Sequence, residues 1–285
     1  NVLVAGQATA KIADVVFSGN GTVNTVKFMR TGISNNATLK NVYLYDGMTR
    51  VAGPASATTD GSITFNSVSG LFTVAGTRTL SVRSDIDTGT SGQSVGVALV
   101  SYTVAGSSAA SLSLVGNNLP IASVSLLTAD FPSGMTISPA ATTINAGTVN
   151  QTIWSRNLSV GTRVGKLHAL TVKMIGSAPV NTLANVKLFV DGTQVSTAVV
   201  DASGYVNFDL SASPLSLTTG SHIVDVRADV VGGANRNFYM VLEQASDIRL
   251  EDSQVPGAFV TVTTNSGSSA INLAGGTVTV KNGTL

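Results

Sequence analysis

The amino-acid sequence predicts an all-β protein built of two tandem immunoglobulin-like Greek-key β-sandwich domains. The first ground is composition: hydrophobic residues make up 43% of the 285 residues, yet aromatic residues make up only 5%. Val, Thr, Ser, Ala and Gly predominate, and β-branched side chains suit a pleated sheet better than a helix. The second ground is an internal repeat, and the third is the regular spacing of short apolar runs between turn residues.

The internal repeat consists of three segments of the first half that recur, in order, in the second half. The matching pairs are 38–47 (TLKNVYLYDG) with 182–192 (TLANVKLFVDG), 61–65 (GSITF) with 204–208 (GYVNF), and 82–86 (VRSDI) with 226–230 (VRADV). Three ordered matches at nearly one spacing indicate a duplicated unit of structure.

The first repeated segment is typical of a strand that runs into a tight hairpin, because Asp-Gly favours a two-residue turn. Alternation along that strand predicts that Val42 and Leu44 face the core while Tyr43 and Tyr45 face outward. Lys187 replaces Tyr43 in the second copy, as expected of an outward position. The inward positions of the second copy are Val186 and Leu188.

The chain length suits two domains, each large enough to bury a core. We expect them at residues 1–130 and 131–285, with a linker within 127–141 where Pro132 and Pro139 would break any strand ladder. The expected strands are 8–17, 23–30, 39–45, 62–66, 79–84, 94–103 and 121–126, then 150–159, 166–175, 184–190, 205–210, 222–229, 237–243 and 258–263.

The charge pattern argues against several classes of partner. Charged residues are only 11% of the chain, and the net charge is +1, so little repulsion keeps copies apart. This favours association with copies of itself over an ordinary monomeric secreted domain. Lys and Arg are scattered singly, which argues against nucleic acid. No apolar run approaches the roughly 20 residues that span a bilayer, so no membrane span is expected.

No catalytic residues and no cofactor are predicted. The chain has no Cys, which removes thiolate chemistry and disulfides. Its histidines, His168 and His222, have no histidine counterparts in the first copy, so a two-His metal site is disfavoured. A calcium site needs several converging oxygens, and the weak candidates are Asp85, Asp87 and Asp229. Paired glycosidase-type carboxylates are not marked by any motif.

Two further residue types recur or stand out. Arg83 and Arg227 each lie two residues before an Asp on a strand, so we expect each to pair with that Asp, at 85 or 229, with ligand binding as the minor alternative. The lone Trp154 is expected in a core or an interface. A sugar-stacking platform is the alternative, with Tyr43, Tyr45, Phe189 and Tyr239.

Five Asn-x-Ser/Thr sequons admit glycan attachment, although a sequence this rich in Asn, Ser and Thr produces about that many by chance. They begin at Asn20, Asn36, Asn150, Asn157 and Asn282.

Each copy begins with a similar short element, 4–7 (VAGQ) and 145–148 (NAGT), and a third occurs late, at 273–280 (LAGGTVTV). We expect this last element to be an opening strand without its own domain. Either the chain is a window from a longer repeat protein, or this strand pairs with a neighbouring molecule. The alternative is that residues 277–280 form the last strand of the second domain. The predicted self-assembly residues are Val2, Leu3, Val4, Ile12, Ile271, Leu273, Val278 and Val280.

Residues 39–47, the Val-Arg-x-Asp strand and the segment 116–121 together resemble repeat domains of prokaryotic surface-layer and cell-appendage proteins. This resemblance implies immunoglobulin-like modules outside the cell, assembled into lattices or fibres, and it supplies no catalytic residues. We therefore expect a non-enzymatic, extracellular structural subunit of a filament or surface layer. It would assemble by strand complementation involving residues 1–17 or 271–280. The alternative is an adhesin or carbohydrate-binding surface protein whose domains act as spacers.

Overall fold

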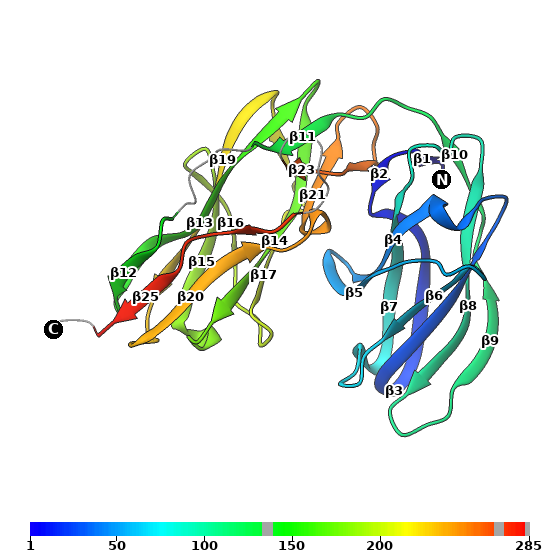
Figure 1. The fold of residues 1–285 in the computed structure, drawn as a ribbon, viewed down its shortest axis with the longest axis horizontal. Helices are drawn as coiled ribbons and strands as arrows, with labels where there is room; N and C mark the ends of the chain where they lie inside the picture. The colour runs from blue at the N-terminus through cyan, green and yellow to red at the C-terminus, as the bar shows by residue number, and fades with distance from the viewer. Residues whose placement is uncertain (133–138, 265–270, 283–285) are drawn as a thin grey trace. The chain divides into compact units, whose positions relative to one another are not determined.

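The computed structural model describes residues 1–132, 139–264 and 271–282, and strands make up most of it (Figure 1). The predicted all-β class is confirmed, with sheets packed as in a sandwich. The helices of the described ranges are single 3-10 turns, η1 (Asn36–Thr38), η2 (Val180–Thr182) and η3 (Ala245–Asp247).

The chain divides into two compact units. Unit 1 comprises Asn1–Leu126 together with Gly257–Phe259, and unit 2 comprises Leu127–Pro256 and Val260–Leu285. The division falls a few residues before the boundary predicted after residue 130.

The strands of unit 1 follow the order β1-β10-β8-β3-β7-β4-β5, with β6 also on β3 and β9 also on β8. Their bounds are β1 (Leu3–Val4), β2 (Gln7–Ala8), β3 (Ala10–Thr31), β4 (Leu39–Asp46), β5 (Thr49–Ala55), β6 (Ser62–Asn66), β7 (Phe72–Ile86), β8 (Ser94–Val104), β9 (Ala110–Val115) and β10 (Leu119–Ala122).

Strand β3 joins the two layers of unit 1. It replaces the two strands predicted at 8–17 and 23–30 by one strand of 22 residues. Its first half pairs with β7 from Ala10 to Val23, and its second half pairs with β8 and β6 between Val23 and Thr31. Gly19 and Gly21 lie near the end of the first half with φ of 126° and 149°, which glycine adopts without a steric penalty.

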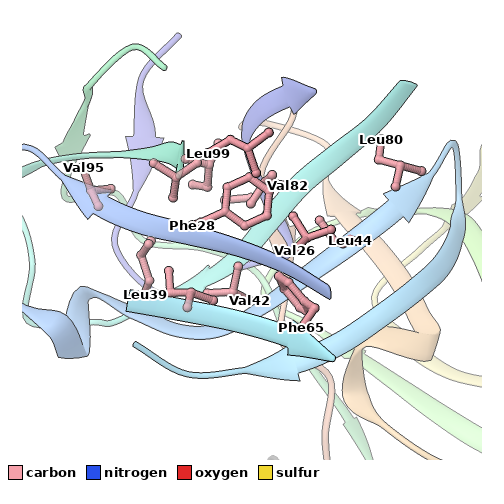
Figure 2. Close-up of a cluster of buried hydrophobic side chains, with 14 of the residues drawn as sticks. Val26, Phe28, Leu39, Val42, Leu44, Phe65, Leu80, Val82, Val95 and Leu99 are labelled. Carbon is pink, nitrogen blue, oxygen red and sulfur yellow. The ribbon is translucent and has the colours of Figure 1, made fainter. Parts of the chain in front are cut away.

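The core of unit 1 is built from side chains of both layers. Phe28 of β3, Leu44 of β4 and Leu80 of β7 are fully or almost fully buried, and Phe28 packs edge-on against Phe65 with ring centroids 6.2 Å apart (Figure 2). The predicted inward residues Val42 and Leu44 lie in this cluster, as predicted.

The outward orientation predicted for Tyr43 and Tyr45 is wrong. Both are buried, at 3% and 1% exposure, and their rings contact each other edge-on at 6.1 Å. The Tyr43 hydroxyl donates a hydrogen bond to Asp85, and Arg83 lies over the ring of Tyr45. The face of β4 that alternation assigns to solvent is therefore covered by polar and charged side chains.

The second part of the chain contains the remaining strands. These are β11 (Thr128–Phe131), β12 (Thr142–Asn145), β13 (Thr148–Gly161), β14 (Gly165–Gly176), β15 (Leu183–Val190), β16 (Thr193–Ala198), β17 (Tyr205–Asp209), β18 (Leu215–Leu217), β19 (Gly220–Val230), β20 (Arg236–Leu242), β21 (Ile248–Asp252), β22 (Phe259–Val260), β23 (Thr263–Thr264), β24 (Leu273–Ala274) and β25 (Val278–Lys281).

Unit 2 has two separate sheets because β13 and β14, the counterparts of the two halves of β3, are distinct strands. One sheet has the order β16-β15-β19-β13-β11-β23. The other runs β12-β25-β20-β14-β21, with β17 and β18 also on β14 and β24 also on β20. The largest buried side chain of the chain, Trp154 of β13, lies in this unit.

The linker predicted within 127–141 is wrong at its start. Residues 128–131 form β11, which pairs antiparallel with β13, and the ring of Phe131 is buried. Pro132 follows the strand rather than interrupting it. The segment 133–138, which was expected to break a ladder, lies outside the described residues.

The prediction of a third opening strand without a domain is also wrong. Strand β24 pairs with β20, and β25 lies between β20 and β12. Val278 and Val280 are fully buried. The element is the closing strand of unit 2, which was the alternative for residues 277–280. It corresponds to β10 of unit 1, because β10 pairs parallel with β1 as β25 pairs parallel with β12.

Candidate functional site

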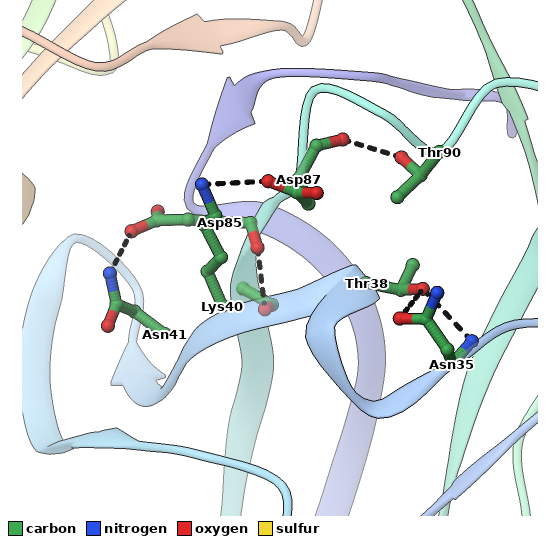
Figure 3. Close-up of polar contacts among 8 residues, drawn as sticks. Asn35, Thr38, Lys40, Asn41, Asp85, Asp87 and Thr90 are labelled. Carbon is green, nitrogen blue, oxygen red and sulfur yellow. Dashed lines mark hydrogen bonds and ion pairs between the residues drawn. The ribbon is translucent and has the colours of Figure 1, made fainter.

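The recurring Asn and Asp of the repeat meet in a polar network in unit 1. The Asp85 carboxylate accepts a hydrogen bond from the Asn41 side chain at 2.9 Å (Figure 3). It also accepts hydrogen bonds from the backbone N–H of Thr9 at 2.8 Å and from the Tyr43 hydroxyl at 3.2 Å. Thr9 has a φ of 44°, which non-glycine residues rarely adopt. The carboxylate therefore holds the chain at the bend that leads into β3.

Unit 2 repeats this network with the corresponding residues. Asp229 accepts hydrogen bonds from the N–H of Asn150 and from the Asn185 side chain, both at 2.7 Å. Asn150 has a φ of 50°, like Thr9 in unit 1. We call these networks the Asn–Asp clamps, comprising Thr9, Asn41 and Asp85 in unit 1 and Asn150, Asn185 and Asp229 in unit 2.

The clamps differ in their electrostatics because the hydrogen bonds of the Asp85 clamp are partly buried, whereas those of the Asp229 clamp are exposed. Burial raises the pKa of Asp85, against the hydrogen bonds from Thr9, Asn41 and Tyr43. The pKa of Asp229 is instead lowered, first by the hydrogen bond from Asn185 and then by that from Asn150. The hydrogen bonds of the clamp therefore determine the direction of the pKa shift at Asp229, whereas burial determines it at Asp85.

The pairing predicted within each Val-Arg-x-Asp segment is wrong. The Arg83 guanidinium bonds the carbonyl of Thr9 at 3.3 Å and lies 5.6 Å from the ring centre of Tyr45. Arg227 bonds Asp225 at 2.9 Å and lies 4.2 Å from the ring centre of Phe189. Each Arg covers the aromatic ring of the repeated strand, and each Asp serves its clamp, so the recurrence is structural in origin.

Each of the three weak calcium candidates has a hydrogen-bond or ion-pair partner of its own. Asp85 and Asp229 belong to different units and serve the clamps, while Asp87 pairs with Lys40 at 2.7 Å (Figure 3). That contact lowers the pKa of Asp87. The described residues contain no cluster of three or more His, Cys, Asp or Glu side chains suited to a metal ion.

Both histidines pair with carboxylates of their own unit. His168 Nε2 lies 2.7 Å from Glu251, and His222 Nδ1 lies 2.7 Å from Asp191. His222 Nε2 also faces the carbonyl of Thr218 at 2.9 Å, so both ring nitrogens face acceptors. Burial opposes protonation of His222, but the hydrogen bonds to Asp191 and Thr218 outweigh it and raise the pKa.

The Asp of each Asp-Gly turn has a role beyond the turn. Asp191 also accepts the N–H of Ile223 at 2.8 Å. In unit 1 the corresponding Asp46 pairs with Arg78 at 3.0 Å. The β3–β7 and β13–β19 pairings place Arg78 and His222 at equivalent positions, opposite Phe17 and Leu158, so each hairpin is fixed to the neighbouring strand by a basic side chain.

Trp154 lies in the core, as expected. Its indole N–H donates to the carbonyl of Leu273 at 2.8 Å, and its ring packs edge-on against Phe131 at 6.5 Å. Trp154, Tyr43 and Tyr45 are all buried, so the sugar-stacking platform proposed as the alternative lacks three of its rings.

The predicted self-assembly residues lie mostly inside the two sandwiches. Leu3 and Val4 pair with Ile121 and Ala122 in unit 1, and Ile12 is buried in its core. Ile271, Val278 and Val280 are buried too, whereas Leu273 is partly exposed and Val2 is 62% exposed. These positions build the domains that contain them.

Glycan attachment at the sequons stays a prediction. The Asn20 side chain accepts the N–H of Gly76, and the Asn36 side chain donates to the carbonyls of Thr58 and Thr59. In the sequon that begins at Asn282, positions 283 and 284 lie outside the described residues.

A groove along unit 1 is a feature that the sequence did not indicate. Two adjoining pockets of about 320 and 310 Å³ share Val16, Leu99 and Leu114. Val16 and Leu114 are 60% and 58% exposed, and Val115 beside them is 67% exposed. Apolar side chains that share a groove are a stronger sign of binding than the same residues scattered singly. We call this feature the β3–β9 seam.

Comparisons with known proteins leave the family open. No protein-family model matches the chain, and no curated protein matches it. Solved structures with some likeness include BcpA, the major pilin subunit of Bacillus cereus, at 10% identity and a TM-score of 0.19, over 83% of this chain and 66% of that one. The collagen adhesin of S. aureus has 12% identity and a TM-score of 0.17, over 98% of each chain.

A membrane-anchored protein of Corynebacterium diphtheriae has 13% identity and a TM-score of 0.15, over 92% of this chain and 52% of that one. Likeness at these TM-scores carries no argument about function. Among the described residues, no helix combines the length and the apolar character needed to cross a bilayer.

Proposed function

We propose that this chain is a non-enzymatic structural subunit of an extracellular filament or surface layer that associates with copies of itself. The observation that carries the proposal is that the repeated residues make contacts within their own unit. The recurring Asn, Asp and Arg side chains hold strands, bends and rings within each unit. The repeat therefore encodes a building module used twice.

The surface supports association between modules. Charged residues are 11% of the chain and the net charge is +1, so repulsion between copies is weak. Exposed apolar residues line the β3–β9 seam of unit 1. The rival function, an adhesin or carbohydrate-binding protein with spacer domains, shares the modules but needs no polymer.

Sedimentation of the purified chain, with electron microscopy of the pelleted material, tests the proposal. We expect large, regular filaments or sheets. A monomer that persists at high protein concentration would contradict the structural role and favour the spacer alternative. For the non-enzymatic part of the proposal, alanine variants of His168, His222 and Asp191 that circular dichroism shows to be folded should keep any hydrolytic background unchanged. Loss of turnover in a folded variant would contradict this part of the proposal.

A further inference from the structure

Strand β11 closes in unit 2 a seam that unit 1 leaves open. In unit 2 the outer edge of β13 pairs with β11, where Val160 lies opposite Ala129 and Ser159 opposite Asp130. In unit 1 the positions equivalent to Val160 and Ser159 are Gly19 and Ser18 of β3. The strand pairing establishes this equivalence. Gly19 lies opposite Gly76 of β7, and Val160 lies opposite Gly220, the equivalent residue of β19.

Within residues 1–126, no described strand lies at the place along β3 that β11 fills along β13 in unit 2. Among the described strands, β7 is the one that pairs with β3 from residue 10 to residue 22, so the other edge of β3 is open over that stretch. Ser18 and Gly19 line the pocket of about 320 Å³. The open edge and the pocket thus coincide with the place that β11 fills in unit 2.

A difference in side-chain size between the two units also enlarges the seam. Trp154 lies opposite Val226 and its counterpart Ala13 lies opposite Val82, so a methyl group replaces the indole. In unit 2 the indole bonds Leu273, whose counterpart in unit 1 is Leu114. Ala13 and Leu114 both line the pocket of about 310 Å³. The pocket lies where unit 2 places Trp154, and Trp154 is the residue that Phe131 of β11 contacts.

The far side of the seam confirms this alignment. The N–H of Gly116 donates to the carbonyl of Val97 at 2.9 Å, and the N–H of Gly275 donates to that of Met240 at 2.8 Å. The wall that Leu273 and Gly275 form in unit 2 is therefore formed by Leu114 and Gly116 in unit 1. A cavity of about 150 Å³ already holds a benzene ring, so either pocket has room for the side chain of a Phe.

We propose that the β3–β9 seam of unit 1 accepts an extended strand from a partner, with the pattern of residues 127–131, Leu-Thr-Ala-Asp-Phe. The strand's backbone bonds the open edge of β3, and its aromatic ring enters the pocket beside Ala13, as in strand addition to a sheet edge. That the strand comes from another subunit of the assembly rests on the proposed function. That the seam binds such a strand does not depend on the proposed function.

A fluorescent synthetic peptide of residues 126–132, titrated onto the full chain and followed by anisotropy, tests the proposal. We expect saturable binding. A peptide with Phe131→Ala should bind about tenfold more weakly or worse, because it loses the burial of one phenyl ring. No saturable binding to the wild-type chain would overturn the proposal.

Protein variants locate the binding. Leu114→Glu and Val16→Glu place a carboxylate in the groove and should each weaken binding by about tenfold or more. Val68→Glu is the matched control, because Val68 is 96% exposed and does not line the seam, and it should bind like the wild type. Equal binding by all three variants would overturn the proposal. A change in Trp154 fluorescence that follows peptide binding would also overturn it, since the peptide would then be replacing β11 in unit 2.

Sedimentation of the same variants separates this inference from the proposed function. If Leu114→Glu abolished self-association but the wild type bound no peptide, the seam would contact a different surface of a second copy. That result would overturn the proposal that the seam binds an extended strand. Filaments without peptide binding would leave the structural role standing and refute the seam. Peptide binding without any polymer would support the seam and refute the structural role.

Discussion

The Asn185 side chain donates a hydrogen bond to Asp229 at 2.7 Å, and in the other unit Asn41 donates the same bond to Asp85 at 2.9 Å. In both units the bond joins neighbouring strands and the Asp also holds a backbone N–H at a bend with positive φ. The repeated polar letters of the sequence are therefore explained by one local structure.

Replacing Asp85 by Ala should destabilise unit 1 by about 2–3 kcal/mol, because it leaves buried donors from Thr9, Asn41 and Tyr43 without their acceptor. Asp229→Ala is the matched variant and should have a smaller effect, because water can reach the donors there. Differential scanning calorimetry of the two variants checks this. Equal losses would mean that burial does not govern the clamp.

The clamp of unit 1 should also respond to acid in a characteristic direction. The folded pKa of Asp85 is raised, so the folded state binds a proton more readily than the unfolded chain. The contribution of Asp85 to stability should therefore increase as pH falls from its folded pKa toward the unfolded value of about 3.9. Calorimetry across this range on the wild type and Asp85→Asn should show that slope in the wild type only.

Asp229 provides the opposite sign. Its folded pKa is lowered, so its contribution is present above the unfolded pKa and lost as pH falls through the folded value. Asp229→Asn should therefore reduce the stability that unit 2 loses in acid. A variant that loses more stability in acid than the wild type would contradict this assignment.

His222 should make unit 2 less stable as pH rises. Its pKa is raised in the folded state, so the contribution is fully present below the unfolded value near about 6.5 and is lost as pH rises through the folded pKa. Urea unfolding followed by Trp154 fluorescence reports on unit 2, because the chain has one Trp. His222→Gln should lose this slope, and an unchanged slope would assign the titration elsewhere.

Trp154→Ala should cost unit 2 about 3–5 kcal/mol, because it removes a fully buried ring and the bond to Leu273. Ala13→Trp in unit 1 is the converse change and should raise the melting temperature of that unit by filling the pocket. Thermal unfolding by circular dichroism checks both. A destabilising Ala13→Trp would show that the pocket does not match an indole.

Val280→Asp should unfold unit 2, because Val280 is fully buried in β25. Val199→Asp is the control, since Val199 is 81% exposed. Trp154 emission and limited proteolysis distinguish them. If Val280→Asp kept unit 2 intact and removed only assembly, the terminal strand would be an assembly element after all.

The fold was predictable because composition, repeat and alternation depend on local chemistry. The repeated Leu, Val and Asp-Gly positions marked β4 and β15, with Val42 and Leu44 inward. Tyr43 and Tyr45 were misplaced because alternation assigns one face to solvent, whereas the clamp and Arg83 cover that face. The seam was missed because an Ala and two Gly in a strand give no sign of what is absent beside them.

The sequence alone determined the all-β class, the duplication and the residues that recur, since these follow from side-chain preference and self-similarity. Only the tertiary structure decided which strands close each unit. The sequence pattern of residues 273–280 predicts a strand equally well whether that strand pairs with β20 or with another chain. It also decided that β11 fills one seam and leaves its counterpart open, since pairing between residues far apart in sequence depends on packing rather than on local pattern.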